Sequence, residues 1–443
     1  MNELLTEILA AREQRAIKQQ TLLRQYEKPL VCFTMNIPGP KKLDRDVSVG
    51  FFVGNRMLAD AIGPKALIHF EQHRAITGCE AYYVVDMPAE MLKRLTVEIE
   101  DSHPSARLFD MDVLDTDGRK AERQALGLPR RKCLLCDTDA VICASTRAHP
   151  LTELQDRTGF LLYLAARQLF AEYIGAQAYM ALQREVNTTP KPGLVDRNNR
   201  GAHTDMDMRH FFVSANALRP FLTRCAETGY LTRDDAPQKT FSDIRSIGKE
   251  AEDAMLKATR GVNTHKGAIF SMGILCAAAG RLDPALWQPE TLLRECAAMT
   301  EGVVDTDLGH ITPENAHTPG ERLYAQYGIT GVRGQAEAGF PAVGRVGLPI
   351  FREGLAKGLS MNDAGCAALL HILTASDDTN LIHRSDRQTQ LEVQAQIAQL
   401  LRVTPFPDHA TIQNLDRDFI QRNLSPGGTA DLLAMTYFLH SLT

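Results

Sequence analysis

Two aspartates separated by a single residue give the first chemical signal in the chain. In the stretch "LFDMDVL", Asp110 and Asp112 alternate with apolar residues. Alternate side chains of a β-strand point to opposite faces, so both carboxylates would share one face while their apolar neighbours pack on a core. Such a pair suits a divalent metal ion that binds a polyphosphate. Arg107, just upstream, favours a phosphate site, and the alternative is two solvated aspartates on an edge strand.

A second cluster combines thiols with an imidazole. The stretch "RRKCLLCDTDAVICASTRAH" contains Cys133, Cys136, Cys143 and His149. A C-x2-C pair is a common half of a zinc site, but the second half, C-x5-H, is loosely spaced. Structural zinc requires all four ligands close together, so we expect a turn of buried thiols and keep zinc as the alternative.

The most polar segment is "EVNTTPKPGLVDRNNRGAHTDMD", which ends at Asp207. Two prolines stiffen it and Gly193 allows a tight turn, which lowers the entropy cost of holding a charged site. We therefore predict a loop that binds a metal ion, a phosphate or a sugar. Helix capping by Asp205 would explain one aspartate but not the whole cluster. The candidate binding residues are Lys191, Asp196, Arg197, His203, Asp205 and Asp207.

Another candidate site precedes an apolar helical pattern. In "RGVNTHKGAIFSMG", Asn263, His265 and Lys266 come directly before the apolar residues. The N-terminus of a helix with an adjacent lysine can bind an anion. The alternative is an ordinary polar turn.

Two later motifs complete the set of candidate residues. In "YGITGVRGQAEAGFP", glycines that permit close approach of a ligand surround Arg333 and Glu337. In "TASDDTNLIHRSD", Asp378 and Asn380 follow a helical pattern. Acidic residues at the C-terminus of a helix are disfavoured by its dipole, so a metal ion or a cationic partner would help to explain them.

Two kinds of architecture must position these residues. Before residue 160, residues 2–27 predict an amphipathic helix and residues 47–61 a second one. The stretches "PLVCFTM", "AYYVVDMP", "RLTVEIED" and "ARLFDMDVLD" predict strands, whereas later patterns are helical almost throughout. We therefore predict two domains, an α/β (α+β) domain over residues 1–160 and an all-α helical domain over residues 161–443.

Composition limits the class of function. The chain has 443 residues, a formal net charge of −5 and a pI of about 6.2. This balance argues against a general nucleic-acid-binding protein, which usually carries a basic field. The longest weakly polar run, residues 267–280, is too short to span a bilayer, and the first residues do not resemble a signal peptide. Nine cysteines, mostly in apolar surroundings, indicate reduced thiols, so we expect a cytoplasmic protein that binds neither nucleic acid nor membrane.

The motifs resemble those of two enzyme families. The segments "VCFTMNIPGP", "HPSARLFDMDVLD" and "RRKCLLCDTDAVICA" are similar to the citrate lyase holo-acyl-carrier-protein synthases, which are phosphoribosyl-dephospho-CoA transferases. The segments "EVNTTPKPGLVDRNNRGAH", "ATRGVNTHKGAIFS", "YGITGVRGQAEAGFP" and "NLSPGGTADLLAMTYFL" resemble triphosphoribosyl-dephospho-CoA synthase. The chain thus resembles a fusion of both families. Where the second family commonly has Gly-Asp-Thr-Asn, this chain has Ser-Asp-Asp-Thr-Asn, which leaves Asp378 and Asn380 aligned.

The resemblance implies two consecutive reactions. The C-terminal domain would join ATP to 3′-dephospho-CoA: the 2′-hydroxyl of dephospho-CoA attacks C1′ of the ATP ribose, and adenine leaves. The N-terminal domain would transfer the phosphoribosyl-dephospho-CoA unit to a Ser of the citrate lyase acyl carrier subunit and release diphosphate. Mg2+ is the implied metal ion.

This chemistry gives each set of residues a role. Glycosyl transfer needs a base near the attacking hydroxyl and neutralisation of charge along the triphosphate. Asp110 and Asp112 with Mg2+ would serve phosphoryl transfer, by a chemical analogy that predicts a nucleotidyltransferase-like N-terminal domain. The carboxylates that would supply the base or hold Mg2+ in the helical domain are Asp196, Asp205, Asp207, Glu337 and Asp378. The groups that would bind the substrates are Arg107, Lys191, Arg197, His203, Asn263, His265, Lys266, Arg333 and Asn380.

Two other functions fit parts of the sequence. The helical domain and its "DDTN" loosely resemble ADP-ribosyl hydrolases, so a Mg2+-dependent glycohydrolase is one alternative, with water in place of the ribose hydroxyl. A non-catalytic chaperone that docks citrate lyase subunits is the other. In that case Asp110 and Asp112 would be dispensable for carrier maturation.

Overall fold

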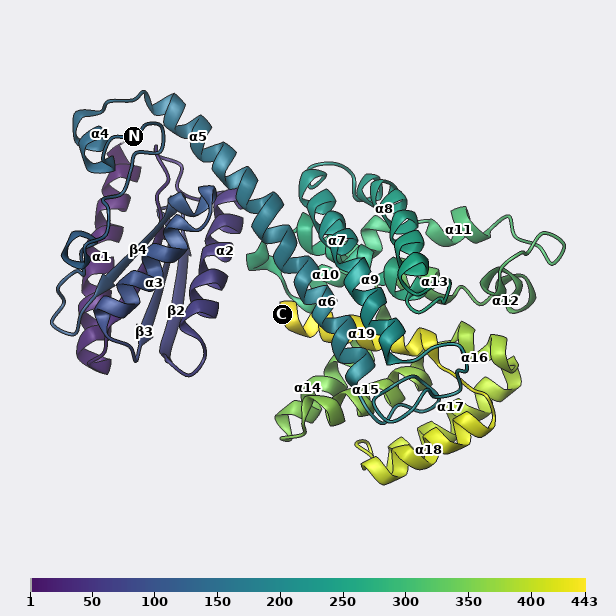
Figure 1. The fold of residues 1–443 in the computed structure, drawn as a ribbon. Helices are drawn as coiled ribbons and strands as arrows, with labels where there is room; N and C mark the ends of the chain where they lie inside the picture. The colour runs from purple at the N-terminus through teal and green to yellow at the C-terminus, as the bar shows by residue number, and fades with distance from the viewer. Residues whose placement is uncertain (1) are drawn as a thin grey trace. The chain divides into compact units, whose positions relative to one another are not determined.

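The computed structural model describes residues 2–443, with side chains from Thr6 onward (Figure 1). The chain divides into two compact units. The first extends to Phe170 and includes the short segment Asp283–Ala285, and the second comprises Ala171–Leu282 and Leu286–Thr443. This division agrees with the predicted presence of two domains.

The first unit is built around a four-stranded antiparallel sheet (Figure 1). The strands lie in the order β2-β3-β1-β4, so β4 forms one edge and pairs with β1. The predicted strands in "LVCFTM", "AYYVV" and "FDMDVL" are confirmed as β1, β3 and β4. The strand bounds are β1 (Leu30–Met35), β2 (Leu67–Ala75), β3 (Gly78–Val85) and β4 (Phe109–Leu114).

Helices cover both faces of this sheet. On one face, Leu22 and Leu23 of α1 pack against Cys32 of β1 and Leu114 of β4. On the other face, Phe51 of α2 stacks on a phenylalanine of β1. The helices of this unit are α1 (Asn2–Tyr26), α2 (Arg45–Ile62), α3 (Ala89–Asp101), η1 (Pro104–Leu108), η2 (Gln124–Leu126), α4 (Ala140–Thr146), α5 (Leu151–Leu164) and η3 (Ala165–Phe170).

One sequence prediction in this unit was wrong, and one strand was not predicted. The stretch "RLTVEIED" was expected to be a strand, but it lies inside α3. Leu92, Thr96 and Ile99 are buried at helical spacing, and this spacing competes with the alternation that suggested a strand. The strand β2 was not predicted because polar residues lie on both of its faces, and none of its residues is fully buried.

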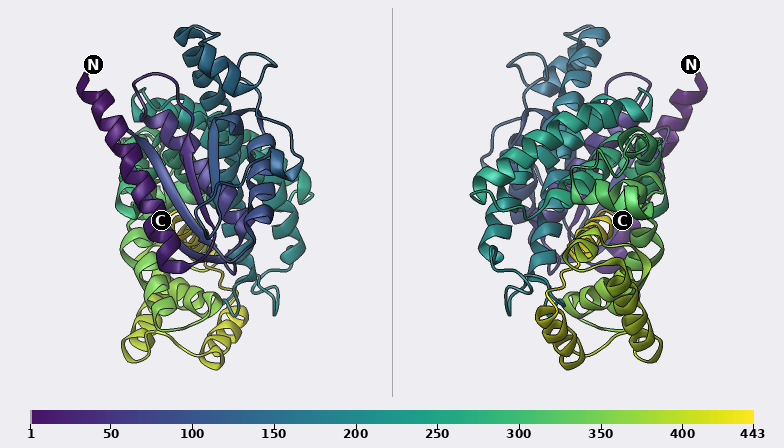
Figure 2. Two further views of the ribbon diagram at one scale, coloured as in Figure 1. Left: turned by 90° about the vertical axis from the view of Figure 1, so that its left-hand side faces the viewer. Right: turned by 90° about the vertical axis from the view of Figure 1, so that its right-hand side faces the viewer.

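The second unit consists of helices joined by loops, and every strand within residues 2–443 belongs to the first unit. The apolar helix α19 packs against α6, α9 and α15, and Figure 2 shows it in yellow among the green and teal helices. The helices are α6 (Ala171–Asn187), α7 (Met208–Leu231), α8 (Pro237–Ala258), α9 (Lys266–Arg281), α10 (Pro289–Met299), α11 (Val303–Leu308), α12 (Pro319–Tyr327), α13 (Gly331–Glu337), η5 (Ala342–Gly347), α14 (Leu348–Ala356), α15 (Met361–Ala375), α16 (Thr379–Arg384), α17 (Arg387–Val403), α18 (His409–Gln421) and α19 (Gly427–Leu442). The short helix η4 (Pro284–Leu286) begins in the segment that belongs to the first unit. Within residues 2–443, no helix combines the length and the low polarity needed to cross a bilayer.

Candidate functional sites

The two aspartates of β4 lie on one face of the sheet, as their spacing predicts. Phe109, Met111 and Val113 are buried, whereas Asp110 and Asp112 are half-buried between them. The strand is held from the α3 side, where Lys93 donates a hydrogen bond to the Met111 carbonyl at 3.1 Å. The pleat of an ordered edge strand therefore fixes both carboxylates on the same face.

Each of these carboxylates faces one cation. The Asp112 carboxylate lies 2.7 Å from the Lys120 ammonium, and the Asp110 carboxylate lies 3.3 Å from the Arg131 guanidinium. Arg131 also donates hydrogen bonds to the backbone carbonyls of Arg107 and Phe109, which fixes the guanidinium at the start of the strand. Burial and the negative charge of Asp112 raise the pKa of Asp110, and Arg131 opposes that shift.

A basic cavity of about 400 Å³ lies beside this strand. Arg131 belongs to both features, because it lines the cavity and pairs with Asp110. Arg107 also lines the cavity and donates a hydrogen bond to the Cys133 carbonyl at 2.9 Å. Lys132 and Arg147 add two further cations to the lining, so the cavity suits an anionic ligand.

In the second unit, the loop between α6 and α7 is held from within by Asp196. Its buried carboxylate accepts hydrogen bonds from the Thr189 hydroxyl at 2.7 Å and from the backbone N–H groups of Lys191 and Asn198 at 3.0 and 2.7 Å. Asp416 of α18 accepts two further hydrogen bonds from the same loop. In this arrangement, Asp196 orders the loop.

Lys191 forms a buried ion pair with Glu185, the last acidic residue of α6. Its side chain is only 1% exposed, and its ammonium also donates to the Glu185 carbonyl at 2.9 Å. Burial raises the pKa of Glu185, and Lys191 opposes that shift. Lys191 thus neutralises a buried carboxylate instead of facing solvent.

Asp431, a carboxylate that was not among the predicted site residues, completes this region. Asp431 in the first turns of α19 is half-buried, and across residues 6–443 no hydrogen bond or ion pair engages its carboxylate. Burial and the nearby carboxylates of Glu185 and Asp378 raise its pKa well above the usual range. Its Oδ2 atom occupies the space that a Cβ on Gly267 would fill, so Gly267 admits this carboxylate to the first turn of α9. Its motif, "SPGGTADLL", carried the resemblance, but residue type alone did not distinguish Asp431 as a functional residue.

His265 lies at the same end of α9. Its ring is buried, its Nδ1 is 2.6 Å from the Ser214 hydroxyl, and its Nε2 is a buried polar atom with no hydrogen-bond partner in the described part of the chain. The Thr264 hydroxyl shares this lack of a partner. Burial lowers the pKa of His265 to about 3, and Lys191 adds to that shift, so the ring is neutral. Two unsatisfied buried groups beside a helix N-terminus mark a place where a ligand can bind.

Two predicted phosphate-binding residues meet at a second cavity. It measures about 330 Å³, and Lys266 and Arg333 both line it. Arg333 donates to Asp307 at 2.8 Å, and Lys266 pairs with Glu252 at 2.9 Å. Arg245 and Lys249 also line the cavity, which gives it four cations against the carboxylates of Glu252 and Asp307.

Several residues that were predicted to bind substrate or metal cap helices or hold loops in place through hydrogen bonds. Asp207 is the N-cap of α7 and accepts the N–H of Arg209 at 2.9 Å, so Asp205 is not the cap that the alternative interpretation required. Asp205 itself is largely exposed. Glu337 accepts the N–H of Gly302 at 2.7 Å, next to the start of α11.

Asp378 has a similar structural position. It caps α16 with one carboxylate oxygen, and its other oxygen accepts from the Thr429 N–H at 2.7 Å and from the Thr429 hydroxyl at 2.8 Å. Burial raises its pKa. Asn380 follows in the first turn of α16, and its amide lies against Gly427.

The remaining predicted residues lie outside both cavities. His203 bridges Ser425 at 2.8 Å and Arg384 at 3.1 Å, and burial together with Arg384 lowers its pKa to about 4. Arg197 donates to Asn187 at 3.1 Å. Asn263 accepts the N–H of Lys266 at 3.2 Å and so caps the start of α9.

Comparison with known proteins identifies both parts of the chain. Residues 3–162 match the family described as apo-citrate lyase phosphoribosyl-dephospho-CoA transferase, and residues 171–443 match the family described as ATP:dephospho-CoA triphosphoribosyl transferase. The chain belongs to both families. It is similar along nearly its whole length to a Haemophilus influenzae protein named Protein CitXG, with 37% identity over 98% of this chain and 95% of the relative. A Leuconostoc mesenteroides protein of the same name is 33% identical over 99% of this chain and 97% of the relative.

Membership of both families establishes the activity at the level of the reaction. The chain is a bifunctional transferase that matures the prosthetic group of citrate lyase: one half makes the triphosphoribosyl-dephospho-CoA precursor, and the other transfers the phosphoribosyl-dephospho-CoA unit to the apo-enzyme.

Proposed function

We propose that the first unit carries out the transfer at the Asp110–Asp112 face of β4, in the manner of a nucleotidyltransferase. The supporting observation is the position of Arg131. This residue pairs with Asp110, one of the two half-buried carboxylates, and also lines the basic cavity. The triphosphoribosyl-dephospho-CoA would bind with its phosphates near Arg107 and Arg131. The carrier Ser hydroxyl would then attack the α-phosphate, with diphosphate as the leaving group.

The residues at this face fit a Mg2+ ion. Asp110 and Asp112 each use one oxygen for a cation, and within residues 6–443 the second oxygen of each has no hydrogen-bond partner. Oxygen ligands of this kind are those that Mg2+ prefers, and it is commonly held by one or two carboxylates together with substrate phosphates. When bound there, the ion would neutralise the negative charge that develops on the phosphate.

In the second unit, we place glycosyl transfer at the first turn of α9. Within residues 6–443 no hydrogen bond or ion pair engages the Asp431 carboxylate, which leaves it available to accept a proton. It would accept the proton of the dephospho-CoA 2′-hydroxyl as that oxygen attacks C1′ of the ATP ribose. The unsatisfied Nε2 atom of His265 lies at the same helix end and would bind the nucleotide.

The triphosphate in this proposal lies in the second cavity. Lys266 connects the two features, since it lines the cavity and follows His265 directly. Lys266 and Arg333 would bind the phosphates together with Arg245, which already shares Asp307 with Arg333. Charge-assisted hydrogen bonds from arginine and lysine are the usual means of holding polyphosphate.

The decisive experiment is mass spectrometry of the apo acyl carrier subunit after incubation with the full chain, ATP, Mg2+ and 3′-dephospho-CoA. Addition of the complete prosthetic group, with adenine and diphosphate in the supernatant, is expected. Ribose triphosphate in place of a joined nucleotide would instead indicate a glycohydrolase. A joined nucleotide with an unmodified carrier would overturn the proposal for the first unit alone.

A further inference from the structure

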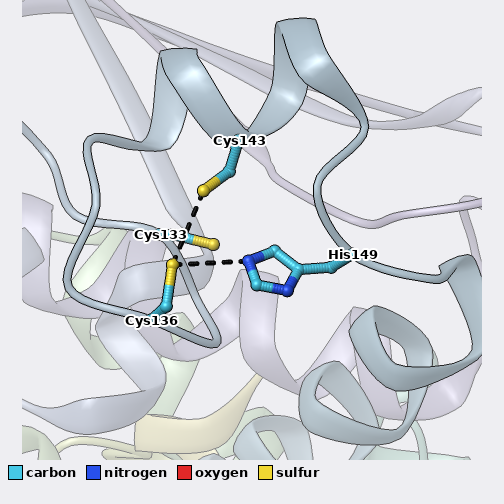
Figure 3. Close-up of side chains that lie close together, drawn as sticks. All are labelled: Cys133, Cys136, Cys143 and His149. Carbon is cyan, nitrogen blue, oxygen red and sulfur yellow. Dashed lines mark hydrogen bonds between the residues drawn. The ribbon is translucent and has the colours of Figure 1, made fainter.

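We propose that Cys133, Cys136, Cys143 and His149 form a structural zinc site in the first unit. Figure 3 shows these side chains converging on one point. One ligand atom from each, three sulfurs and one imidazole nitrogen, lies within 4.8 Å of all the others. A site of this composition lies outside the residues assigned to either reaction.

The distances are those of a tetrahedral site. The Cys136 sulfur lies 3.5 Å from the Cys143 sulfur and 3.3 Å from the His149 Nε2 atom (Figure 3). Zn–S and Zn–N bonds of roughly 2.3 and 2.0 Å place tetrahedral ligand atoms about 3.5–3.8 Å apart. The loose sequence spacing favoured a turn of buried thiols over a zinc site. The spacing does not keep the ligands apart, because the short helix α4 brings Cys143 back to the C-x2-C turn.

The surrounding segment has no core of its own, so it needs such a ligand. Between residues 115 and 150, Cys133 and Cys143 are the only buried side chains, at 7% and 8% exposed. Val141 of α4, the helix that contains Cys143, is 77% exposed. A segment that buries so little apolar surface cannot offset the entropy cost of ordering. Small modules of this kind are usually stabilised by a metal ion or by disulfide bonds.

The chemistry of the ligand set selects zinc in a structural role. Three thiolates and one imidazole are a common structural zinc set, and four protein ligands leave no position open for substrate. On binding, the three thiols release their protons, and the free energy of binding becomes folding free energy for the segment. The other six cysteines lie buried elsewhere in the protein, outside this cluster.

A bound ion would also fix part of the cavity described above. Cys133, Cys143 and His149 line it together with Arg131, two residues before the first ligand. The backbone of Lys132 and Cys133 accepts hydrogen bonds from Arg107. Ordering this segment therefore holds Arg131 in place against Asp110.

The test measures metal directly. The full chain, produced in zinc-supplemented medium and dialysed, is expected to contain one zinc per molecule by inductively coupled plasma mass spectrometry. Cys136→Ser and His149→Ala are expected to lose most of it, whereas Cys79→Ala, a matched change at a buried cysteine of β3, retains it. Cobalt substitution of the unaltered chain should produce the intense visible bands of a tetrahedral thiolate site. This measurement does not require any variant to fold.

Three outcomes would overturn the proposal. The first is a chain that contains no zinc and gives no cobalt spectrum. The second is Cys136→Ser chain with full zinc content and an unchanged cobalt spectrum. The third is a Cys136–Cys143 disulfide, found by non-reducing peptide mapping of freshly prepared protein, together with absence of zinc.

Discussion

The two proposed reaction centres are assembled in different ways. On β4, two carboxylates come from one strand and lie at the surface with one cation each. In the second unit, Glu185, Asp378 and Asp431 come from three separate parts of the chain, and Lys191 is held in a buried pair with the first. The strand site relies on local geometry, whereas the helical site relies on packing.

This difference has an energetic consequence. Exposed pairs such as Asp112–Lys120 contribute little to stability, so the β4 carboxylates can change partners when substrate arrives. The buried Lys191–Glu185 pair cannot lose one member without leaving an uncompensated charge. We therefore expect substitutions on β4 to act on rate alone, and substitutions around Lys191 to act on folding as well.

The largest expected effect comes from removing both charges on β4. Asp110→Asn with Asp112→Asn should reduce transfer to the carrier on the order of 10³-fold or more, since the proposed metal ion would supply several kcal/mol of charge stabilisation. Adenine release from ATP and dephospho-CoA should change less than about twofold, because that reaction belongs to the other unit. Carrier mass and adenine are measured in the same reaction, with Asp117→Asn as the control. Unimpaired carrier loading would instead show that the transfer reaction does not use Asp110 and Asp112.

A change in the helical site should show the reverse pattern. Asp431→Asn should reduce adenine release by about 10²–10³-fold because the proposed general base is lost. Loading of the carrier from pre-made triphosphoribosyl-dephospho-CoA should be unaffected. Asp377→Asn, at a carboxylate paired with Arg387, is the matched control. Adenine release within threefold of the unaltered chain would remove Asp431 from the mechanism.

The second cavity allows a finer test of the same half. Lys266→Met and Arg333→Met should each raise the KM for ATP by roughly 10-fold or more, the loss expected for one charge-assisted contact. Carrier loading from the pre-made intermediate should again stay constant. Lys357→Met, at an exposed lysine paired with Glu353, controls for general loss of charge. If neither KM changes, the triphosphate binds elsewhere.

The smallest effect concerns stability as a function of pH. His203 and His265 have pKa values of about 4 and about 3, both lowered by burial. As the pH falls below about 6.5, these histidines therefore bind protons in the unfolded chain before they do so in the folded protein. The contribution of these histidines to the free energy of unfolding is therefore fully present above that pH. Below it, the free energy of unfolding should fall by about 1.4 kcal/mol per pH unit per histidine. Urea unfolding followed by Trp287 fluorescence, which reports on the second unit, measures this slope. His203→Gln should reduce the slope, and an unchanged slope would contradict the assignment.

Much of the β4 site was predictable because its parts are neighbours in sequence. The alternation of Phe109, Asp110, Met111 and Asp112 places the carboxylates on one face of any strand, whatever its surroundings. The sequence did not reveal the partners Lys120 and Arg131, which a turn and a long loop bring back to the strand. The zinc-ligand cluster shows the same limit, since its spacing appeared too loose until α4 closed the distance.

The sequence predicted which motifs form the helical site, but it did not predict the role of each residue in them. The resemblance identified the segments that contain Lys191, His265 and Asp378, yet residue type alone could not separate a phosphate ligand from a buried counter-ion or a helix cap. Asp431 was missed because it follows small residues in an apolar helix and has no charged neighbour in sequence. Burial raises its pKa first, and the carboxylates that add to the shift, Glu185 and Asp378, lie 53 or more residues away along the chain.

The amino-acid sequence by itself determined the two families, the helical character of the second half and the shared face of Asp110 and Asp112, because each depends on residues close together along the chain. The tertiary structure alone decided which charges are buried, which are paired and which remain available for substrate. Burial and pairing depend on distances between side chains that are remote in sequence, and only packing sets those distances.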